Sequence, residues 1–94
     1  MNFLFELMLV AKPLDEAEIE KVISNVKNIV DKNFGIIKRV QYLGHKRLTY
    51  TIKNSVEGIC TVIELKATSR CAREIQRKLR YDDSVLRHMM VRKS

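Results

Sequence analysis

The feature that most constrains the fold is a change in the spacing of apolar residues along the chain. Over residues 3–12 apolar side chains occupy nearly every position, and Phe3, Phe5 and Leu7 alternate, as in a central β-strand. Over residues 16–33 the apolar spacing becomes three and four, which predicts an amphipathic helix. The stripe consists of Ile19, Val22, Ile23, Val26, Ile29 and Val30.

The boundaries of this helix have their own signals. Pro13-Leu14 is expected to end the first strand, and Asp15 is expected to cap the helix, with Glu18 as its capping-box partner. Gly35 suits a left-handed helix stop.

Strand spacing then returns. A second strand is expected from Ile36 towards Leu43, interrupted by a bulge at Gly44, and it resumes with Leu48, Tyr50 and Ile52 on one side. Residues 54–58 are interpreted as a hairpin loop, and 59–66, rich in β-branched residues, as a third strand.

A second helix is expected over residues 70–81, capped by Thr68 or Ser69, and a last strand over 84–93. The order is therefore β-α-β-β-α-β. Right-handed crossovers place both helices on one face of a four-stranded antiparallel sheet, the ferredoxin-like arrangement. With 94 residues, the chain 1–94 is expected to form a single domain.

Charge is distributed unevenly. Residues 1–34 hold four lysines against six acidic residues, a net −2, whereas residues 35–94 hold fourteen basic against five acidic residues, a net +9. A polyanionic partner reached from the second half is the favoured interpretation, with simple solubility as the alternative. Eight arginines favour nucleic acid, because a guanidinium matches phosphate better than an ammonium does.

The sequence gives little support for catalysis, for a bound cofactor or for a membrane-spanning segment. The sequence has no phosphate loop, nucleophile elbow or zinc-protease motif, and we expect no enzyme, cofactor, metal or small-molecule substrate. Cys60 and Cys71 are expected to be reduced thiols. The apolar run that ends by Lys12 is too short to span a bilayer, and a strand starting almost at Met1 leaves no room for a cleaved signal.

Two known protein classes with this topology, an enzyme family and an RNA-binding domain, do not match the sequence. The segment Lys12-Pro13-Leu14-Asp15 does not match the glycine-rich loop of acylphosphatases. An RNA recognition motif stacks bases on aromatic residues of its sheet, but the strand over 59–66 carries no ring. A basic module that docks on structured RNA and on a protein neighbour remains.

Three segments resemble the family of the sixth protein of the bacterial small ribosomal subunit. GHKRLTYTIK (44–53) resembles the family signature, FELMLVAKP (5–13) its first strand and LRYDDSVLRHMMVRK (79–93) its acidic turn and closing strand. The chain departs from the family pattern at Leu43, Thr49, Thr51 and Cys60. The resemblance covers nearly the whole chain in the same element order.

The resemblance implies a structural, non-enzymatic protein that binds small-subunit ribosomal RNA in the central-domain platform. It implies a heterodimer with the eighteenth small-subunit protein. A bacterial ribosome in the cytoplasm is the expected location, with an organelle-encoded ribosome as the alternative. The residues expected to contact RNA or the partner are Lys46, Arg47, Tyr50, Arg80, Arg87, Arg92 and Lys93.

Several of these residues have a structural alternative. Tyr50 is expected to lie mostly in the core with its hydroxyl at an interface. Arg80 and Arg87 flank Asp82 and Asp83, with which they could instead form surface ion pairs. Arg70, Arg73 and Arg77 share the outer side of the second helix, which is either a solvated face or a contact with RNA.

Overall fold

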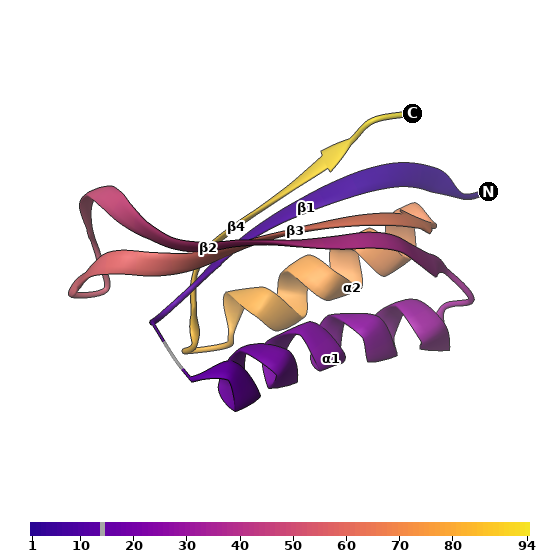
Figure 1. Ribbon diagram of the computed structural model, residues 1–94. Coiled ribbons are helices and arrows are strands. Elements are labelled where there is room, and N and C mark those ends of the chain that lie inside the picture. Colours follow the sequence, from indigo (N-terminus) through magenta and orange to yellow (C-terminus); the bar gives the residue numbers. More distant parts are fainter. Residues whose placement is uncertain (14) are drawn as a thin grey trace.

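The computed structural model describes residues 1–13 and 15–94, so the break expected at Pro13-Leu14 falls partly outside the described residues. Six elements follow the expected order (Figure 1). They are β1 (Phe3–Ala11), α1 (Glu16–Lys32), β2 (Ile36–Ile52), β3 (Ser55–Ala67), α2 (Ser69–Arg80) and β4 (Val85–Arg92). The strands form one antiparallel sheet in the order β2-β3-β1-β4, and both helices cover the same face of it. The ferredoxin-like prediction is confirmed.

The hydrophobic core lies between the sheet and the two helices. Alternate residues of the central strands β1 and β3 point into it, and Leu7, Ile63 and Leu65 are fully buried there. All six residues of the predicted α1 stripe are buried, and Ile75 and Leu79 lead the inner side of α2. Each such side chain stabilises the fold by about 1.5–3 kcal/mol relative to exposure.

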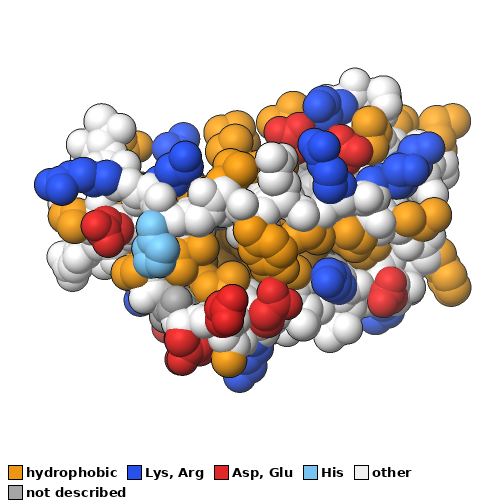
Figure 2. Space-filling view, viewed as in Figure 1, with side chains coloured by type: hydrophobic (Ala, Val, Ile, Leu, Met, Phe, Trp, Pro, Cys, Tyr) orange, Lys and Arg blue, Asp and Glu red, His pale blue; other side chains and the backbone are white. Residues whose placement is uncertain are grey.

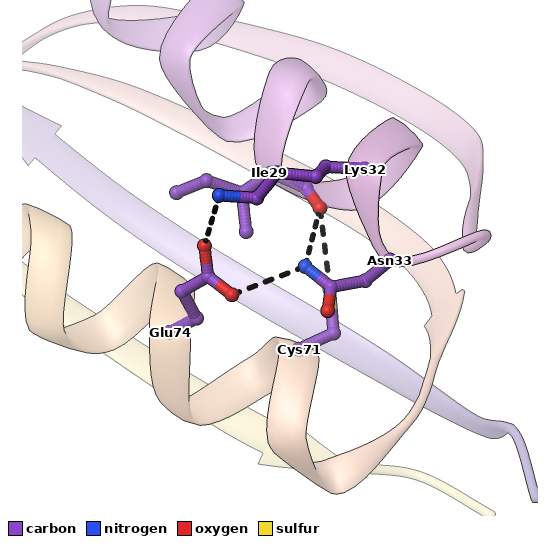
Figure 3. Close-up of polar contacts among 5 residues, drawn as sticks. All are labelled: Ile29, Lys32, Asn33, Cys71 and Glu74. Carbon is purple, nitrogen blue, oxygen red and sulfur yellow. Dashed lines mark hydrogen bonds and ion pairs between the residues drawn. The ribbon is translucent and has the colours of Figure 1, made fainter.

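A polar clamp joins the C-terminal end of α1 to α2 (Figure 3). The Asn33 side-chain amide donates to the backbone oxygen of Ile29 at 2.8 Å and to a Glu74 oxygen at 3.2 Å. Lys32 forms an ion pair with the other Glu74 oxygen at 3.0 Å. The hydrogen bonds and the ion pair hold the pKa of Glu74 below its ordinary value. The one acidic side chain of α2 is therefore occupied by α1.

The helix starts agree with the sequence analysis, and one helix end does not. The Asp15 side chain accepts from the Glu18 N–H at 2.9 Å, and Thr68 caps α2 by accepting from the Cys71 N–H at 3.1 Å. The left-handed residue after α1 is Phe34 (φ 58°), not Gly35. Gly35 is needed for space instead, because a Cβ there would lie 2.8 Å from the Lys66 backbone oxygen.

The β2–β3 hairpin is longer than expected. The loop predicted over residues 54–58 is wrong, since β3 begins at Ser55 and the turn consists of Lys53 and Asn54. Both have positive φ (48° and 65°), as a two-residue type I′ turn requires. The bulge at Gly44 is confirmed by its φ of 80° and by a register shift between Tyr42 and Gly44. The hairpin extends beyond the helices at one end of the sheet (Figure 1).

Candidate nucleic-acid and partner interface

Residues from β2 and β4 meet at the base of the hairpin. Arg47 and Tyr50 of β2 and Arg87 of β4 line one small hollow of about 160 Å³, whose other lining residues are Val10, Leu48, Thr49 and Ile52. Both arginines are exposed, and Lys46 precedes Arg47 on the same exposed strand. We call Lys46, Arg47, Tyr50, Lys53 and Arg87 the hairpin-base site.

Tyr50 corrects the sequence analysis. Its side chain is 62% exposed, so it is not mostly in the core. The hairpin of which Tyr50 is part extends beyond the helices that cover the rest of the sheet (Figure 1). An exposed phenol next to Arg47 and Arg87 belongs to the surface of this site.

Lys53 was not among the predicted site residues, because the hairpin loop was expected to begin after it. Its Nζ donates to the backbone oxygen of Val85 at 2.9 Å, which ties the hairpin turn to the start of β4. His88 lies nearby on the helix side of β4, and its Nδ1 is buried without a hydrogen-bond partner. Burial lowers the pKa of His88, and the positive charges of Arg80 and Lys53 lower it further. This end of the sheet is therefore electropositive.

The acidic turn does not neutralise that charge. The ion pairs among the described residues join Lys32 to Glu74 and Lys93 to Glu6, so neither Arg80 nor Arg87 pairs with the turn. The Asp82 carboxylate accepts from the Ser84 N–H at 2.8 Å instead. The alternative in which these arginines form surface ion pairs is thus not what the structure contains.

The arginines of α2 are all exposed. Arg70, Arg73, Arg77 and Arg80, which we call the α2 stripe, lie opposite the buried side of the helix. Arg80 is at the end nearest the hairpin base, whereas Arg70 is at the other end. The stripe and the hairpin-base site therefore lie on different layers of the molecule (Figure 1).

Arg92 and Lys93 lie apart from the hairpin-base site. Arg87 and Arg92 are five residues apart on one strand, or about 17 Å. The Arg92 guanidinium stands 3.7 Å from the centroid of the Phe3 ring, and Lys93 pairs with Glu6 at 3.1 Å. Both therefore already have partners within the chain, which weakens the case for RNA contact at this end.

The face of the sheet turned away from the helices carries uncovered apolar side chains that the sequence analysis missed. Met8, Met89 and Val91 are 42%, 44% and 48% exposed, and Met8 and Met89 are directly opposite each other on β1 and β4. We call this surface the open face. The alternation along each strand was a visible signal, but it does not reveal which face of the sheet the helices leave uncovered.

Acidic side chains of α1 face the edge of β2 across a hollow. Figure 2 shows a hollow with apolar walls above acidic side chains of α1. Its lining includes Ile19, Ile59 and the carboxylates of Glu16 and Glu20, and the Tyr42 hydroxyl donates to Glu20 at 2.8 Å. The acidic start of α1 therefore lies close to the hairpin-base site, because His45, which also lines this hollow, directly precedes Lys46.

The described residues contain no group of three or more side chains suited to a metal ion, and no helix among them is long and apolar enough to cross a membrane. Cys60 and Cys71 are free thiols, and burial raises the pKa of Cys71. The arrangement offers cations on a rigid frame and an apolar surface next to them.

Comparisons with known proteins agree with this picture. A family model described as Ribosomal protein S6 matches residues 4–92. Small ribosomal subunit protein bS6 of Mycobacterium leprae is 37% identical over 89 residues, which cover 94% of this chain and 93% of that protein. The protein of the same name from Carboxydothermus hydrogenoformans is 33% identical with the same coverage.

Solved structures match as well. The crystal structure of 30S ribosomal protein S6 from Thermotoga maritima superposes with a TM-score of 0.89 at 26% identity, covering 99% of this chain and 89% of that one. A protein from Arabidopsis thaliana matches with a TM-score of 0.57 at 14% identity, which is a likeness of fold alone.

Proposed function

The chain belongs to the ribosomal protein S6 family, a structural and non-enzymatic component of the small ribosomal subunit, and from this premise we propose that it binds small-subunit ribosomal RNA jointly with the eighteenth small-subunit protein. The RNA is the central-domain platform, as the sequence resemblance implies. The protein acts as one domain over residues 1–94, without cofactor or small-molecule substrate. It works on the ribosome in the bacterial cytoplasm, with an organelle ribosome as the alternative.

The observation that carries the RNA part of the proposal is the convergence at the hairpin base. Arg47 and Arg87 are far apart in sequence, yet both line one hollow, and no acidic residue lines it with them. Glu57 is the cross-strand neighbour of Arg47, but no ion pair joins the two among the described residues. Exposed guanidinium groups held on the strands of a sheet are suited to phosphates, and binding releases condensed counterions.

The α2 stripe and the terminal residues have smaller roles in this proposal. Arg80 extends the positive end of the sheet, and its charge acts on His88. Arg70, Arg73 and Arg77 add to the electrostatic attraction of RNA. Arg92 and Lys93 contact RNA or the partner only if they exchange the contacts that they make with Phe3 and Glu6.

The open face is where we propose that the eighteenth protein docks. Contiguous exposed apolar side chains on one side of a sheet typically mark a protein interface. Met8, Met89 and Val91 provide such a surface, and it borders Arg87 on β4. The partner then covers the apolar surface and adds its own contacts with RNA beside the hairpin base. Neither protein alone has the complete RNA-binding surface.

The test is a binding titration with a central-domain ribosomal RNA fragment, with and without the eighteenth protein, over a series of salt concentrations. We expect tight binding only when both proteins are present, weakening steeply as salt rises. Equal binding to an unrelated structured RNA, unaffected by the partner, would reduce the chain to a generic basic domain.

A variant of the open face separates the two halves of the proposal. Met89→Lys places a charge where the partner is expected to lie, and we expect it to abolish heterodimer formation in size-exclusion chromatography. Asn28→Lys, which adds the same charge at an exposed position of α1, is the matched control and should leave the heterodimer intact. If Met89→Lys forms the heterodimer normally, the partner binds elsewhere.

A further inference from the structure

The outer face of α2 contains a hollow with the chemistry of a nucleotide site. The hollow has a volume of about 360 Å³, and its lining includes no acidic residue. It is formed by Arg73, Gln76, Arg77, Arg80 and Tyr81. Arg77 and Tyr81 also line a second hollow of about 740 Å³ towards α1, so these two side chains stand between the hollows.

The arginines on the outer face of α2 do not stabilise the helix itself. Arg73 and Arg77 are four residues apart, and Arg77 and Arg80 are three apart, spacings at which like charges repel on a helix. Glu74 does not offset them, because its two carboxylate oxygens are bound to Lys32 and Asn33 of α1 (Figure 3). The helix dipole favours cations in the last turn, but it does not account for Arg73.

Tyr81 adds an exposed aromatic ring to this hollow. It is the residue immediately after α2, and its side chain is 76% exposed although it is large and aromatic. A ring that contributes little to the core and stands next to guanidinium groups offers a stacking surface for a base. The combination of stacking ring and phosphate-binding arginines is characteristic of sites for single-stranded nucleic acid.

We propose that the outer face of α2 binds a single-stranded RNA segment, with an unpaired base stacked on Tyr81 and the backbone phosphates on Arg73, Arg77 and Arg80. From Arg73 to Arg80 the helix rises about 10 Å, which accommodates a short stretch of RNA backbone. Gln76 supplies the hydrogen-bonding group of the site.

This inference extends the proposed function. The α2 site lies in the helix layer, whereas the open face lies on the other side of the sheet (Figure 1). With the partner on the open face and structured RNA at the hairpin base, a single-stranded segment on α2 would be a second RNA contact. The protein would then link two RNA segments.

The experiment uses the full chain and an unstructured RNA octanucleotide, with an RNA duplex as the comparison, followed by fluorescence anisotropy at low salt. Tyr81→Leu removes the ring, and we expect it to weaken single-strand binding roughly 5- to 160-fold, the range that corresponds to about 1–3 kcal/mol for one stacked base. Tyr81→Phe keeps the ring and should bind like the parent. Neither change should alter binding to the duplex.

The arginines have their own matched control. Arg73→Gln with Arg77→Gln should reduce the slope of log affinity against log salt by about 1.4, since each contact with a single strand contributes about 0.7. Lys21→Gln with Lys27→Gln removes the same charge from exposed positions of α1 and should leave the slope unchanged. Equal slopes for the two double variants would overturn the assignment of phosphates to α2.

A measurement without substitution guards against misfolded variants. Photo-crosslinking of the parent chain to an octanucleotide containing 5-iodouridine should give an adduct at Tyr81, identified by mass spectrometry. Adducts only at other residues, or equal loss of binding in Tyr81→Leu and Tyr81→Phe, would contradict the inference. The proposed function is tested by a different experiment: it is wrong if the parent chain and the eighteenth protein together do not bind the central-domain fragment, whatever the octanucleotide shows.

Discussion

The hairpin-base site makes a quantitative prediction about salt. In the double variant Arg47→Gln, Arg87→Gln, two cations that line one hollow become neutral without loss of the polar side chain. If each arginine neutralises one phosphate of structured RNA, the slope of log affinity against log salt falls by about 0.9 for each, or about 1.8 in total. The ratio of parent to variant affinity should then fall by about twelve-fold between about 50 and 200 mM salt.

The assay is titration of the heterodimer into a labelled central-domain RNA fragment at four or more salt concentrations. Both arginines are exposed, so the substitutions should change the free energy of unfolding by less than about 0.5 kcal/mol. Lys21→Gln with Lys27→Gln on α1 is the charge-matched control. If the hairpin variant and this control have the same slope, the arginines act through the overall charge of the protein and not through contact.

The remaining predictions concern stability. Gly35→Ala places a Cβ 2.8 Å from the Lys66 backbone oxygen and should lower the free energy of unfolding by about 1–3 kcal/mol in urea titrations; an unchanged midpoint would mean that the strand moves freely. Glu74→Gln should destabilise the protein more at neutral pH than in acid, because a carboxylate whose pKa is lowered by folding loses its contribution as pH falls through that pKa. A constant difference at both pH values would show that charge is not the cause. Because folding lowers the pKa of His88, the unfolded chain binds a proton at this position more readily than the folded chain does as the pH falls below the ordinary value of 6.5. The free energy of unfolding should therefore decrease over this pH range, and His88→Gln should remove the contribution of this residue to the decrease.

The sequence was sufficient for the fold because local and long-range signals agreed. The apolar stripe of α1 has a period that only a helix can bury on one side. Asp15 and Thr68 each cap a helix, because their side chains accept a hydrogen bond from a backbone N–H of the first turn. The alternation of Phe5, Leu7 and Leu9 fixed which side of β1 enters the core. Agreement across these levels is what makes a fold readable from sequence.

The failures have a common physical origin in tertiary contacts. Gly35 looked like a helix stop, but Phe34 takes the left-handed conformation and the glycine serves a close approach to β3 that only the folded sheet creates. The hairpin turn was misplaced because neither Lys53 nor Asn54 is a glycine, although both adopt positive φ. Tyr50 was assigned to the core by strand alternation alone, which does not reveal where the helices stop covering the sheet.

Only part of the candidate site was predictable, because the rest depends on tertiary contacts. Arg47 and Arg87 could be nominated from charge and resemblance, but they lie on the two opposite edge strands of the sheet. They line one hollow only because the long β2–β3 hairpin reaches the start of β4, which the sequence does not reveal. The separation of Arg92 and Lys93 from them, and their contacts with Phe3 and Glu6, depend on strand register. Exposure of Met8 and Met89 follows from the absence of a helix on that face, which alternation does not specify.

The most direct test of the central claim is lysine acetylation footprinting of the complex with the central-domain RNA fragment and the eighteenth protein, read by mass spectrometry. Lys46 and Lys53 belong to the hairpin-base site, whereas Lys21 and Lys27 are exposed on α1. If RNA binds at the hairpin base, acetylation of Lys46 and Lys53 slows in the complex while Lys21 and Lys27 react as in the free protein. Unchanged reactivity of Lys46 and Lys53, with protection of the α1 lysines instead, would place the RNA on the wrong side of the molecule for this account.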